Sequence, residues 1–190
     1  GSQTVTFTYN GDGVRVGKSV DGASTAYVQD LAGGLPMVLA EGGATANRYV
    51  YGGDLLAQVD FQTSYVHADG LGSTRRMSNG SGQAIANYVY DVFGATRVQA
   101  TDSSVSFKYS GEQADDEIAL QFLRARYYEP TIGRFISIDP DVGYSVDTSG
   151  SNRYIYVRNN PVRLVDPAGR FPTGASAAIR GSMRWFVETG

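Results

Sequence analysis

The sequence has few of the residues on which most catalytic and metal-binding sites depend. Its 190 residues include no cysteine, which excludes disulfides, thiol nucleophiles and thiolate metal sites. His67 is the only histidine, so a site with paired histidine ligands is excluded and a Ser-His-Asp triad has one candidate base. We therefore expect no metal and no other cofactor, and any catalysis by this chain must use carboxylates.

Long apolar runs and a strong net charge are also missing. No stretch reaches the roughly 18 apolar residues that a membrane span needs, and no signal peptide is recognisable. The formal net charge of −3 is too small to indicate nucleic-acid binding. We expect no membrane span and no nucleic-acid partner.

The few charges are unevenly distributed. Residues 101–150 carry a net charge of −5, and residues 151–190 carry a net charge of +4. We expect the two segments to attract each other within the fold; an acidic partner for the second segment is the alternative.

Glycine and tyrosine are abundant, with 24 and 13 residues, whereas there is a single tryptophan. Hydrophobic residues make up 42% of the chain and charged residues 18%, a composition that excludes a disordered chain. Many tyrosines together with many glycines are typical of short strands joined by tight turns. The composition therefore predicts an all-β protein.

An aromatic residue followed closely by a polar residue and a glycine recurs along the chain. The leading aromatics lie 20, 22, 16, 23 and 19 residues apart, at Phe7, Tyr27, Tyr49, Tyr65, Tyr88 and Phe107. A unit of this length holds two strands and two turns, which is a β-hairpin. Residues 4–9 alternate as a strand should, and residues 10–13 supply the positive-φ positions of a hairpin turn. The pattern predicts stacked antiparallel hairpins that form a continuous, twisted and coiling sheet.

The pattern changes after Phe107. Residues 120–128 are apolar enough for a strand or a helix, and we favour a strand because Pro130 and Gly133 follow it. Residues 152–158 alternate again, which favours another strand. Residues 176–187 have the apolar spacing of a short helix, although Gly181 weakens it.

Several short motifs are concentrated between residues 65 and 169. They are His67-Ala68-Asp69-Gly70-Leu71-Gly72-Ser73-Thr74-Arg75, Tyr88-Val89-Tyr90-Asp91-Val92-Phe93-Gly94, Arg124-Ala125-Arg126-Tyr127-Tyr128-Glu129-Pro130, Gly133-Arg134-Phe135, Asp139-Pro140, Asn159-Asn160-Pro161 and Asp166-Pro167-Ala168-Gly169. Together with the repeats, these motifs resemble the tyrosine-aspartate (YD) repeats and the repeat-associated core domain of the Rhs family.

The resemblance implies a domain organisation and a function. Residues 1–106 correspond to YD-type hairpin repeats, residues 107–169 to the core domain, and residues 170–190 to a tail or the start of a variable region. Proteins of this family are generally secreted or cell-surface polymorphic toxins whose repeats form a hollow shell that is plugged by the core. The implied role is a scaffold that encloses or presents its own C-terminal effector region. About six repeats are too few to close a shell. We therefore expect either a fragment that is completed by a missing N-terminal shell or a small relative that assembles with other copies of itself.

The resemblance also implies self-cleavage. In several family members an aspartyl peptidase activity within the core cuts just after the second of two Asp-Pro-x-Gly motifs. The second motif here is residues 166–169, and Arg170 stands where leucine is common. The first motif begins at Asp139 and is one residue longer than the family pattern. The resemblance therefore implies Asp139 and Asp166 as the catalytic pair and a cleavage site at Gly169, Arg170 and Phe171.

Two carboxylates held close together can share a proton, so that one acts as a base on water while the other acts as an acid. On the basis of charge alone, Arg134 and Arg153 are candidates to orient a carboxylate or to stabilise the oxyanion. The alternative is that both Asp-Pro segments are only turns, in which aspartate accepts backbone hydrogen bonds. The chain would then be a non-catalytic structural or adhesive cell-surface module that self-associates through exposed sheet edges.

Overall fold

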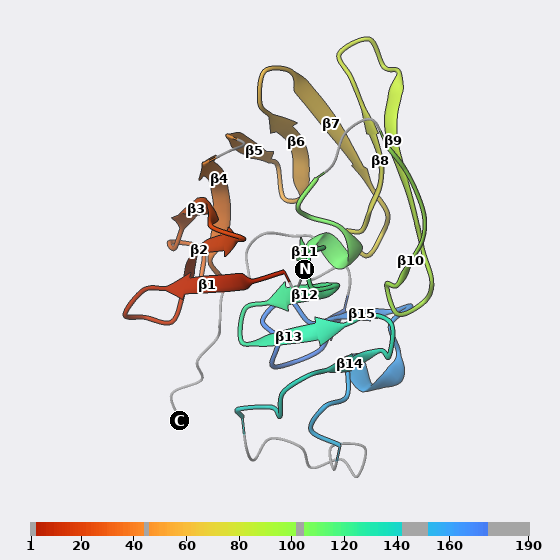
Figure 1. Ribbon diagram of the computed structural model, residues 1–190. Coiled ribbons are helices and arrows are strands. Elements are labelled where there is room, and N and C mark those ends of the chain that lie inside the picture. The colour runs from red at the N-terminus through yellow and green to blue at the C-terminus, as the bar shows by residue number, and fades with distance from the viewer. Residues whose placement is uncertain (1–2, 44–45, 102–104, 142–151, 175–190) are drawn as a thin grey trace.

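The computed structural model describes residues 3–43, 46–101, 105–141 and 152–174. Its main feature is a ten-stranded antiparallel sheet in which every strand pairs with the next one along the chain (Figure 1). The strands are β1 (Val5–Tyr9), β2 (Arg15–Val20), β3 (Ala23–Asp30), β4 (Met37–Gly43), β5 (Asn47–Tyr51), β6 (Leu55–Val59), β7 (Thr63–Ala68), β8 (Thr74–Ser78), β9 (Ala84–Tyr90) and β10 (Thr96–Thr101). This arrangement confirms the predicted all-β fold of stacked hairpins. The predicted helix at residues 176–187 lies outside the described residues.

Four of the hairpin turns share one arrangement of an Asx residue and a glycine. At Asp91, for example, the side-chain Oδ1 accepts the N–H groups of Phe93 and Ala95 at 3.0 and 2.9 Å. The backbone N–H of Gly94 donates to the Asp91 carbonyl at 3.1 Å, and Gly94 has a φ of +91°, which favours glycine. The same contacts occur in the turns that begin at Asn10, Asp69 and Asn79. In these four turns the Asx residue and the glycine therefore close the hairpin locally.

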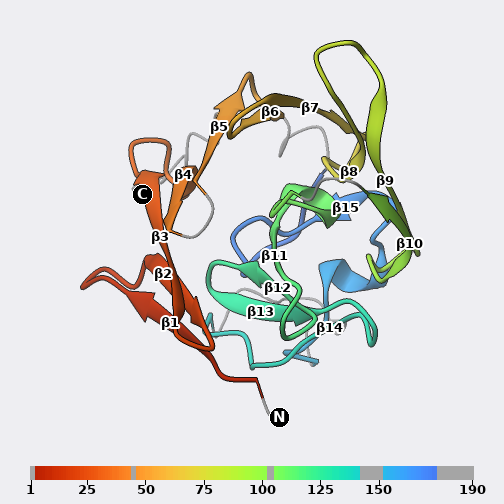
Figure 2. The same cartoon turned by 45° about the horizontal axis from the view of Figure 1, so that its top comes forward.

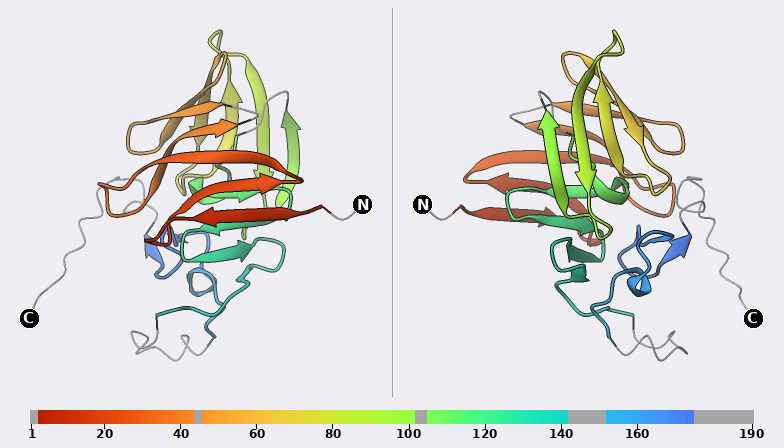
Figure 3. Two further views of the ribbon diagram at one scale, coloured as in Figure 1. Left: turned by 60° about the vertical axis from the view of Figure 1, so that its left-hand side comes forward. Right: turned by 90° about the vertical axis from the view of Figure 1, so that its right-hand side faces the viewer.

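The large sheet curves around a smaller group of strands (Figure 2). Strand direction rotates progressively from β1 to β10 (Figure 3). Six of the nine strand pairs contain a register shift, as between Val28 and Gln29, and such bulges increase the local twist of a sheet. The inner group consists of a four-stranded sheet, β11 (Gln113–Asp115), β12 (Leu120–Leu123), β13 (Arg126–Glu129) and β14 (Arg134–Phe135), and a pair, β15 (Leu164–Val165) and β16 (Thr173–Gly174).

Two predictions for the inner group need correction. Residues 120–128 are not one strand but a hairpin, because the chain reverses at Arg124, which has a φ of +52°. Residues 152–158 do not form a strand: Ile155 makes a single bridge to Arg134, and a 3-10 turn follows at Val157–Asn159. Alternation of apolar residues also arises in irregular segments that are buried on one side, and sequence alone does not separate the two cases.

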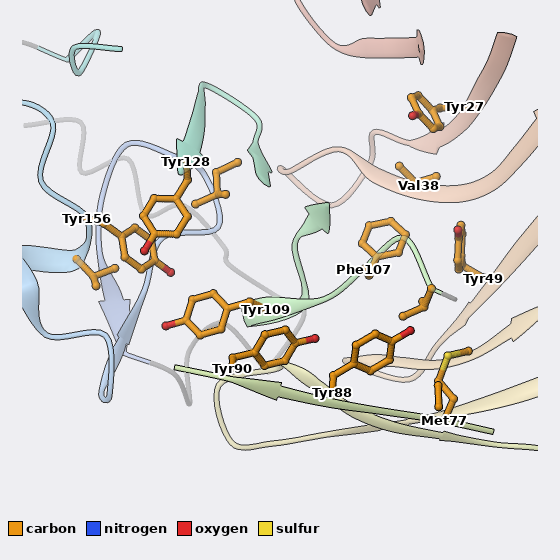
Figure 4. Packing of buried hydrophobic residues seen from close by; sticks show 14 of the residues in the cluster. Tyr27, Val38, Tyr49, Met77, Tyr88, Tyr90, Phe107, Tyr109, Tyr128 and Tyr156 are labelled. Atoms are coloured by element: carbon orange, nitrogen blue, oxygen red, sulfur yellow. The ribbon is translucent and has the colours of Figure 1, made fainter. Parts of the chain in front are cut away.

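Tyrosines of the repeats fill the space between the large sheet and the inner group (Figure 4). Tyr88, Tyr90 and Tyr128 are almost fully buried. Their hydroxyl groups can remain inside because they find acceptors: Tyr90 donates to the Thr74 carbonyl at 3.0 Å, and Tyr128 donates to the Phe93 carbonyl at 2.6 Å. The repeat residues Tyr27, Tyr49, Tyr88 and Tyr90 therefore belong to the core, whereas Tyr9 and Tyr65 are exposed.

A buried ion pair ties the first hairpin to the inner sheet. Arg15, at the start of β2, donates from Nη1 to Oδ2 of Asp115 in β11 at 2.5 Å, and both side chains are completely buried. The guanidinium carbon lies 4.0 Å from the ring centroid of Phe122 and 5.1 Å from that of Phe7. The two sheets are thus joined by a charged contact as well as by apolar packing.

Candidate self-cleavage site

The inner group brings Asp139 and Asp166 onto one arginine that the sequence analysis did not single out. Nη2 of Arg126, in β13, lies 2.9 Å from Oδ2 of Asp139 and 3.5 Å from Oδ2 of Asp166. The side chains of Arg126 and Asp166 are each 2% exposed, whereas that of Asp139 is 20% exposed. The two carboxylates therefore face a common nitrogen, one from the interior and one from the side that water reaches.

The turn that follows Asp166 is held by three consecutive residues of the β12–β13 hairpin. Nη1 of Arg124 donates to the carbonyl of Pro167, and the backbone N–H of Ala125 donates to the carbonyl of Ala168 at 3.3 Å. Nε of Arg126 donates to the carbonyl of Gly169 at 2.6 Å. Three successive donors thus meet three successive carbonyls; we call residues 124–126 the clamp.

Only glycine fits at the last position held by the clamp. Gly169 has a φ of +65°, and a Cβ atom there would lie 2.1 Å from the Leu123 carbonyl oxygen. The glycine of the second Asp-Pro-x-Gly motif is therefore required both for its backbone conformation and for the close approach of the clamp.

The Gly169–Arg170 peptide bond is contacted on both sides. Its carbonyl oxygen accepts from Arg126 Nε, and its N–H donates to Oδ1 of Asp166 at 2.9 Å. The same Oδ1 accepts the N–H of Phe171 at 3.0 Å. A donor on the carbonyl oxygen and a carboxyl on the amide nitrogen are what hydrolysis of this bond would use.

Burial and neighbouring charges shift the pKa values of Asp166 and Arg126 in opposite directions. Burial raises the pKa of Asp166, and the nearby Asp139 charge raises it further, against the backbone N–H groups and Arg126, which lower it. Burial also lowers the pKa of Arg126, although the charges of Asp139 and Asp166 oppose this effect. Asp166 therefore holds a proton to higher pH than an ordinary aspartate does.

The candidate arginines lie in different places. Arg153 donates from Nη2 to the backbone carbonyl of Asp139 and accepts from Arg126 Nη1 at its own carbonyl at 3.1 Å, so it borders the site. Arg134 donates to the carbonyl of Gly133 and to Oδ1 of Asn159, and no contact joins it to either aspartate. Arg126 was missed because an arginine within a strand motif gives no local sign of what it faces across the fold.

Arg170 is the position where the sequence departs from the family pattern. Its Nη1 lies 2.9 and 3.1 Å from the two carboxylate oxygens of Asp141. This pair joins the basic segment 151–190 to the acidic segment 101–150, as the charge distribution predicts. Residues 142 and 143, which end the longer first motif, lie outside the described residues.

A cavity of about 650 Å³ adjoins the turn. Its lining comes from the large sheet and its loops, among them Met37, Tyr51 and Val66, and from the inner group. Pro167 and Arg170 also line it, so the turn after Asp166 borders space on the concave side of the large sheet.

The described residues give less support to a histidine-based site, a metal site or a membrane-spanning helix. His67 lies exposed on β7, where it hydrogen-bonds Ser78 at 2.9 Å. In the part of the chain that the structure describes, no group of three or more His, Asp or Glu side chains is arranged to hold a metal ion. Across the same described ranges, no helix is long and apolar enough to cross a membrane.

A continuous sheet of YD hairpins that curves around a small β-rich core defines a β-shell class of protein. Residues 3–162 match the family model described as "Teneurin YD-shell". The chain belongs to this family, and the resemblance to Rhs and YD-repeat proteins is confirmed.

Similar proteins include several that are described as toxins or nucleases. The tRNA nuclease WapA of Bacillus subtilis (strain 168) is 38% identical over 175 residues, which cover 87% of this chain and 7% of that protein. Toxin subunit YenC2 of Yersinia entomophaga is 39% identical over 99 residues, which cover 50% of this chain and 10% of that subunit. The chain thus spans less than a tenth of the length of WapA.

Solved structures of similar fold include one that is described as a holotoxin pore. The structure described as "Crystal Structure of TcdB2-TccC3-Cdc42" matches with a TM-score of 0.66 and 25% identity, over 93% of this chain and 9% of that one. The Photorhabdus luminescens Tc holotoxin pore with the mutation TccC3-D651A matches with a TM-score of 0.65 and 25% identity, over 89% and 9%. The chain therefore has the architecture of a shell module of the kind found in such toxins.

Proposed function

We propose that this chain is part of a larger secreted or cell-surface toxin of the Rhs type, in which it helps to enclose or present a C-terminal effector region. Residues 1–106 supply shell hairpins, residues 107–169 the core, and residues 170–190 lead towards the effector. Family membership supports this proposal, as does the description of several relatives as toxins. The match to a small part of each relative supports a role as one module among several.

We further propose that the chain cuts itself once, at the Gly169–Arg170 bond. The observation that carries this proposal is that Arg126, which donates to the Gly169 carbonyl, also contacts Asp139 and Asp166, while Asp166 accepts the N–H of Arg170. The alternative, in which Asp166 only closes a turn, accounts for its contacts with backbone N–H groups. It does not account for a second buried contact with an arginine that also holds Gly169.

We propose a role for each group on the basis of its contacts. Asp139, which water reaches, takes a proton from a water molecule whose oxygen attacks the carbonyl carbon of Gly169. Arg126 Nε donates to the oxygen that becomes negatively charged. Asp166, which burial keeps protonated to higher pH, delivers its proton to the nitrogen of Arg170 as the C–N bond breaks. The products are a carboxyl group at Gly169 and an amino group at Arg170.

The experiment that tests this proposal is the intact mass of the purified chain, followed over time. We expect a fragment that ends at Gly169, and no fragment from Asp139→Asn or Asp166→Asn. The matched control is Asp91→Asn in the outer turn, where asparagine can make the same turn contacts, as it does at Asn10. This control should cleave at the wild-type rate.

A single full-length mass for the wild-type chain from acidic to neutral pH would refute self-cleavage and leave the shell role alone. Cleavage that persists in Asp166→Asn would refute the assigned roles. A fragment that ends at Arg170 would place the cut one bond later than proposed.

A self-associating structural module remains the second candidate function, because one observation favours it. Within the described ranges, β1 and β10 each pair with a single neighbouring strand, so both ends of the large sheet have a free edge. Apolar side chains are also exposed along this sheet, at Val28, Val50, Leu56, Val89 and Val98. Sedimentation velocity tests this function: a mass that rises with concentration supports it, and a monomer at every concentration contradicts it.

A further inference from the structure

One residue of the clamp also contacts the shell. Nε of Arg124 donates to the carbonyl of Pro36, in the loop between β3 and β4, at 3.3 Å. Its Nη1 lies 2.6 Å from Oε2 of Glu112 and donates as well to the carbonyl of Pro167. A single guanidinium therefore joins the large sheet, the core and the turn that contains the cleavage site.

Glu112, the charged partner of Arg124, is buried and is linked to the large sheet through backbone hydrogen bonds. It is 6% exposed, and its carbonyl accepts the backbone N–H of Lys108 at 3.0 Å. The carbonyl of Lys108 in turn accepts the N–H of Thr74 in β8 at 3.0 Å. Burial raises the pKa of Glu112 and the Arg124 charge lowers it, so the carboxylate relies on this arginine as its counter-ion. The position of Arg124 is thus set by groups attached to the shell.

The shape of the arginine side chain suits this place. A planar guanidinium offers several donors in fixed directions, whereas a lysine ammonium is a single point charge. Arg124 also sits at the reversal of the β12–β13 hairpin, directly before the two residues that hold Ala168 and Gly169. A shift of Arg124 would therefore move the whole clamp relative to Asp166.

We propose that Arg124 is a positioning residue that couples self-cleavage to the shell. By holding the Pro167 carbonyl against the β3–β4 loop, it fixes the Asp166 carboxylate and the Gly169–Arg170 bond in the reactive arrangement. Cleavage then waits until the hairpin that carries Pro36 has folded around the core. This inference rests on the self-cleavage proposed above, and it assigns the timing of that reaction to a contact outside the catalytic groups.

The first experiment measures the cleavage rate, by intact mass, of Arg124→Met, Arg124→Lys and the control Arg97→Met. Arg97 pairs with Asp91 on the surface, and its side chain is 66% exposed. We expect Arg124→Met to be slower by about 10- to 100-fold, since misplacement of reacting groups by about 1 Å has effects of this size. Arg124→Lys should recover part of the rate, and Arg97→Met should match the wild type. A wild-type rate for Arg124→Met would overturn the inference.

The second experiment tests the contact with the shell. Gly34 precedes Pro36 in the β3–β4 loop and has a φ of +86°, and Gly22 has a φ of +88° in the turn between β2 and β3. Alanine strains either turn, but only the first turn carries the carbonyl that Arg124 holds. We expect Gly34→Ala to cleave more slowly than Gly22→Ala. Equal rates would overturn the coupling to the shell.

A third measurement separates this inference from the proposed function. Amide hydrogen exchange at Arg170 and Phe171 is compared between Asp139→Asn and Asp139→Asn/Arg124→Met, both of which should stay intact. We expect faster exchange in the double variant, on the order of ten-fold, because the clamp loses a charged hydrogen bond. Amides of β7 and β8 should be unchanged. If the wild-type chain never cleaves, the proposed function fails; if exchange is also unchanged, Arg124 does not position the turn.

Discussion

The buried ion pair between Arg15 and Asp115 offers the sharpest test of how the shell is held on the core. The substitution Arg15→Met keeps a long side chain among Phe7, Phe122 and the other aromatic rings but removes the charge. Asp115 then stays buried with Lys18 as its charged neighbour, at 3.2 Å. Burial alone would lower the pKa of Arg15, yet the Asp115 charge and hydrogen bond hold that pKa above its ordinary value. The folded state thus favours the charged pair.

The expected loss in the free energy of unfolding follows from the burial of the ion pair. Removing one partner of a fully buried ion pair typically costs about 3–5 kcal/mol, because the remaining charge is left without compensation. Lys18, whose side chain is 15% exposed, offsets part of this cost, so we expect a loss near the lower figure, about 3 kcal/mol. The double variant Arg15→Met/Asp115→Asn removes both fully buried charges and leaves Lys18 paired with Glu117, so it should regain at least about half of the loss.

Urea unfolding followed by far-UV circular dichroism measures these free energies of unfolding. The control is Arg97→Met, which removes an exposed ion pair and should change the free energy by no more than about 1 kcal/mol. A loss of under about 1 kcal/mol for Arg15→Met, or strictly additive effects in the double variant, would refute the reasoning. The two sheets would then be held together by apolar packing alone.

Three further predictions concern the turns and the site. Gly169→Ala should abolish cleavage in the mass assay and lower the unfolding midpoint, because the Cβ would meet the Leu123 carbonyl at 2.1 Å; a stable variant that still cleaves would contradict the close approach. Gly94→Ala should destabilise the fold by about 1–3 kcal/mol more than Gly22→Ala, since both have positive φ but only the first places a Cβ against Tyr109, at 2.4 Å; equal thermal midpoints would contradict this. The cleavage rate should fall as pH rises through the raised pKa of Asp166, because the acid must carry a proton; a rate that increases steadily with pH would contradict that role.

The hairpin repeats could be predicted from the sequence because their determinants are local. The contacts that close a turn, such as those of Asp91 with Phe93, Gly94 and Ala95, join residues two to four positions apart. Alternation of apolar residues within each strand also marks which face turns inward. Such signals need no knowledge of the rest of the fold, and they predict the continuous sheet of stacked hairpins.

The candidate site could be predicted only in part. The family motif points to Asp139 and Asp166, but Arg126 and the clamp depend on contacts between segments about 13 to 45 positions apart. The charge-based candidate Arg134 faces Asn159 instead of the carboxylates. Charge type alone does not determine which arginine reaches a site, since that depends on how the hairpin at Arg124 reverses and packs against the Asp166 turn.

By itself, the sequence determined the all-β class, the period of about 20 residues, the turns and the family. It also excluded thiol chemistry and paired-histidine sites, because cysteine is absent and His67 is the single histidine. The tertiary structure decided which charges meet: Arg15 pairs with Asp115, and Arg126 pairs with the buried Asp166 and the partly exposed Asp139. The physical reason is that turns and strand alternation arise from neighbouring residues, whereas a buried ion pair exists only after distant segments have excluded water from it.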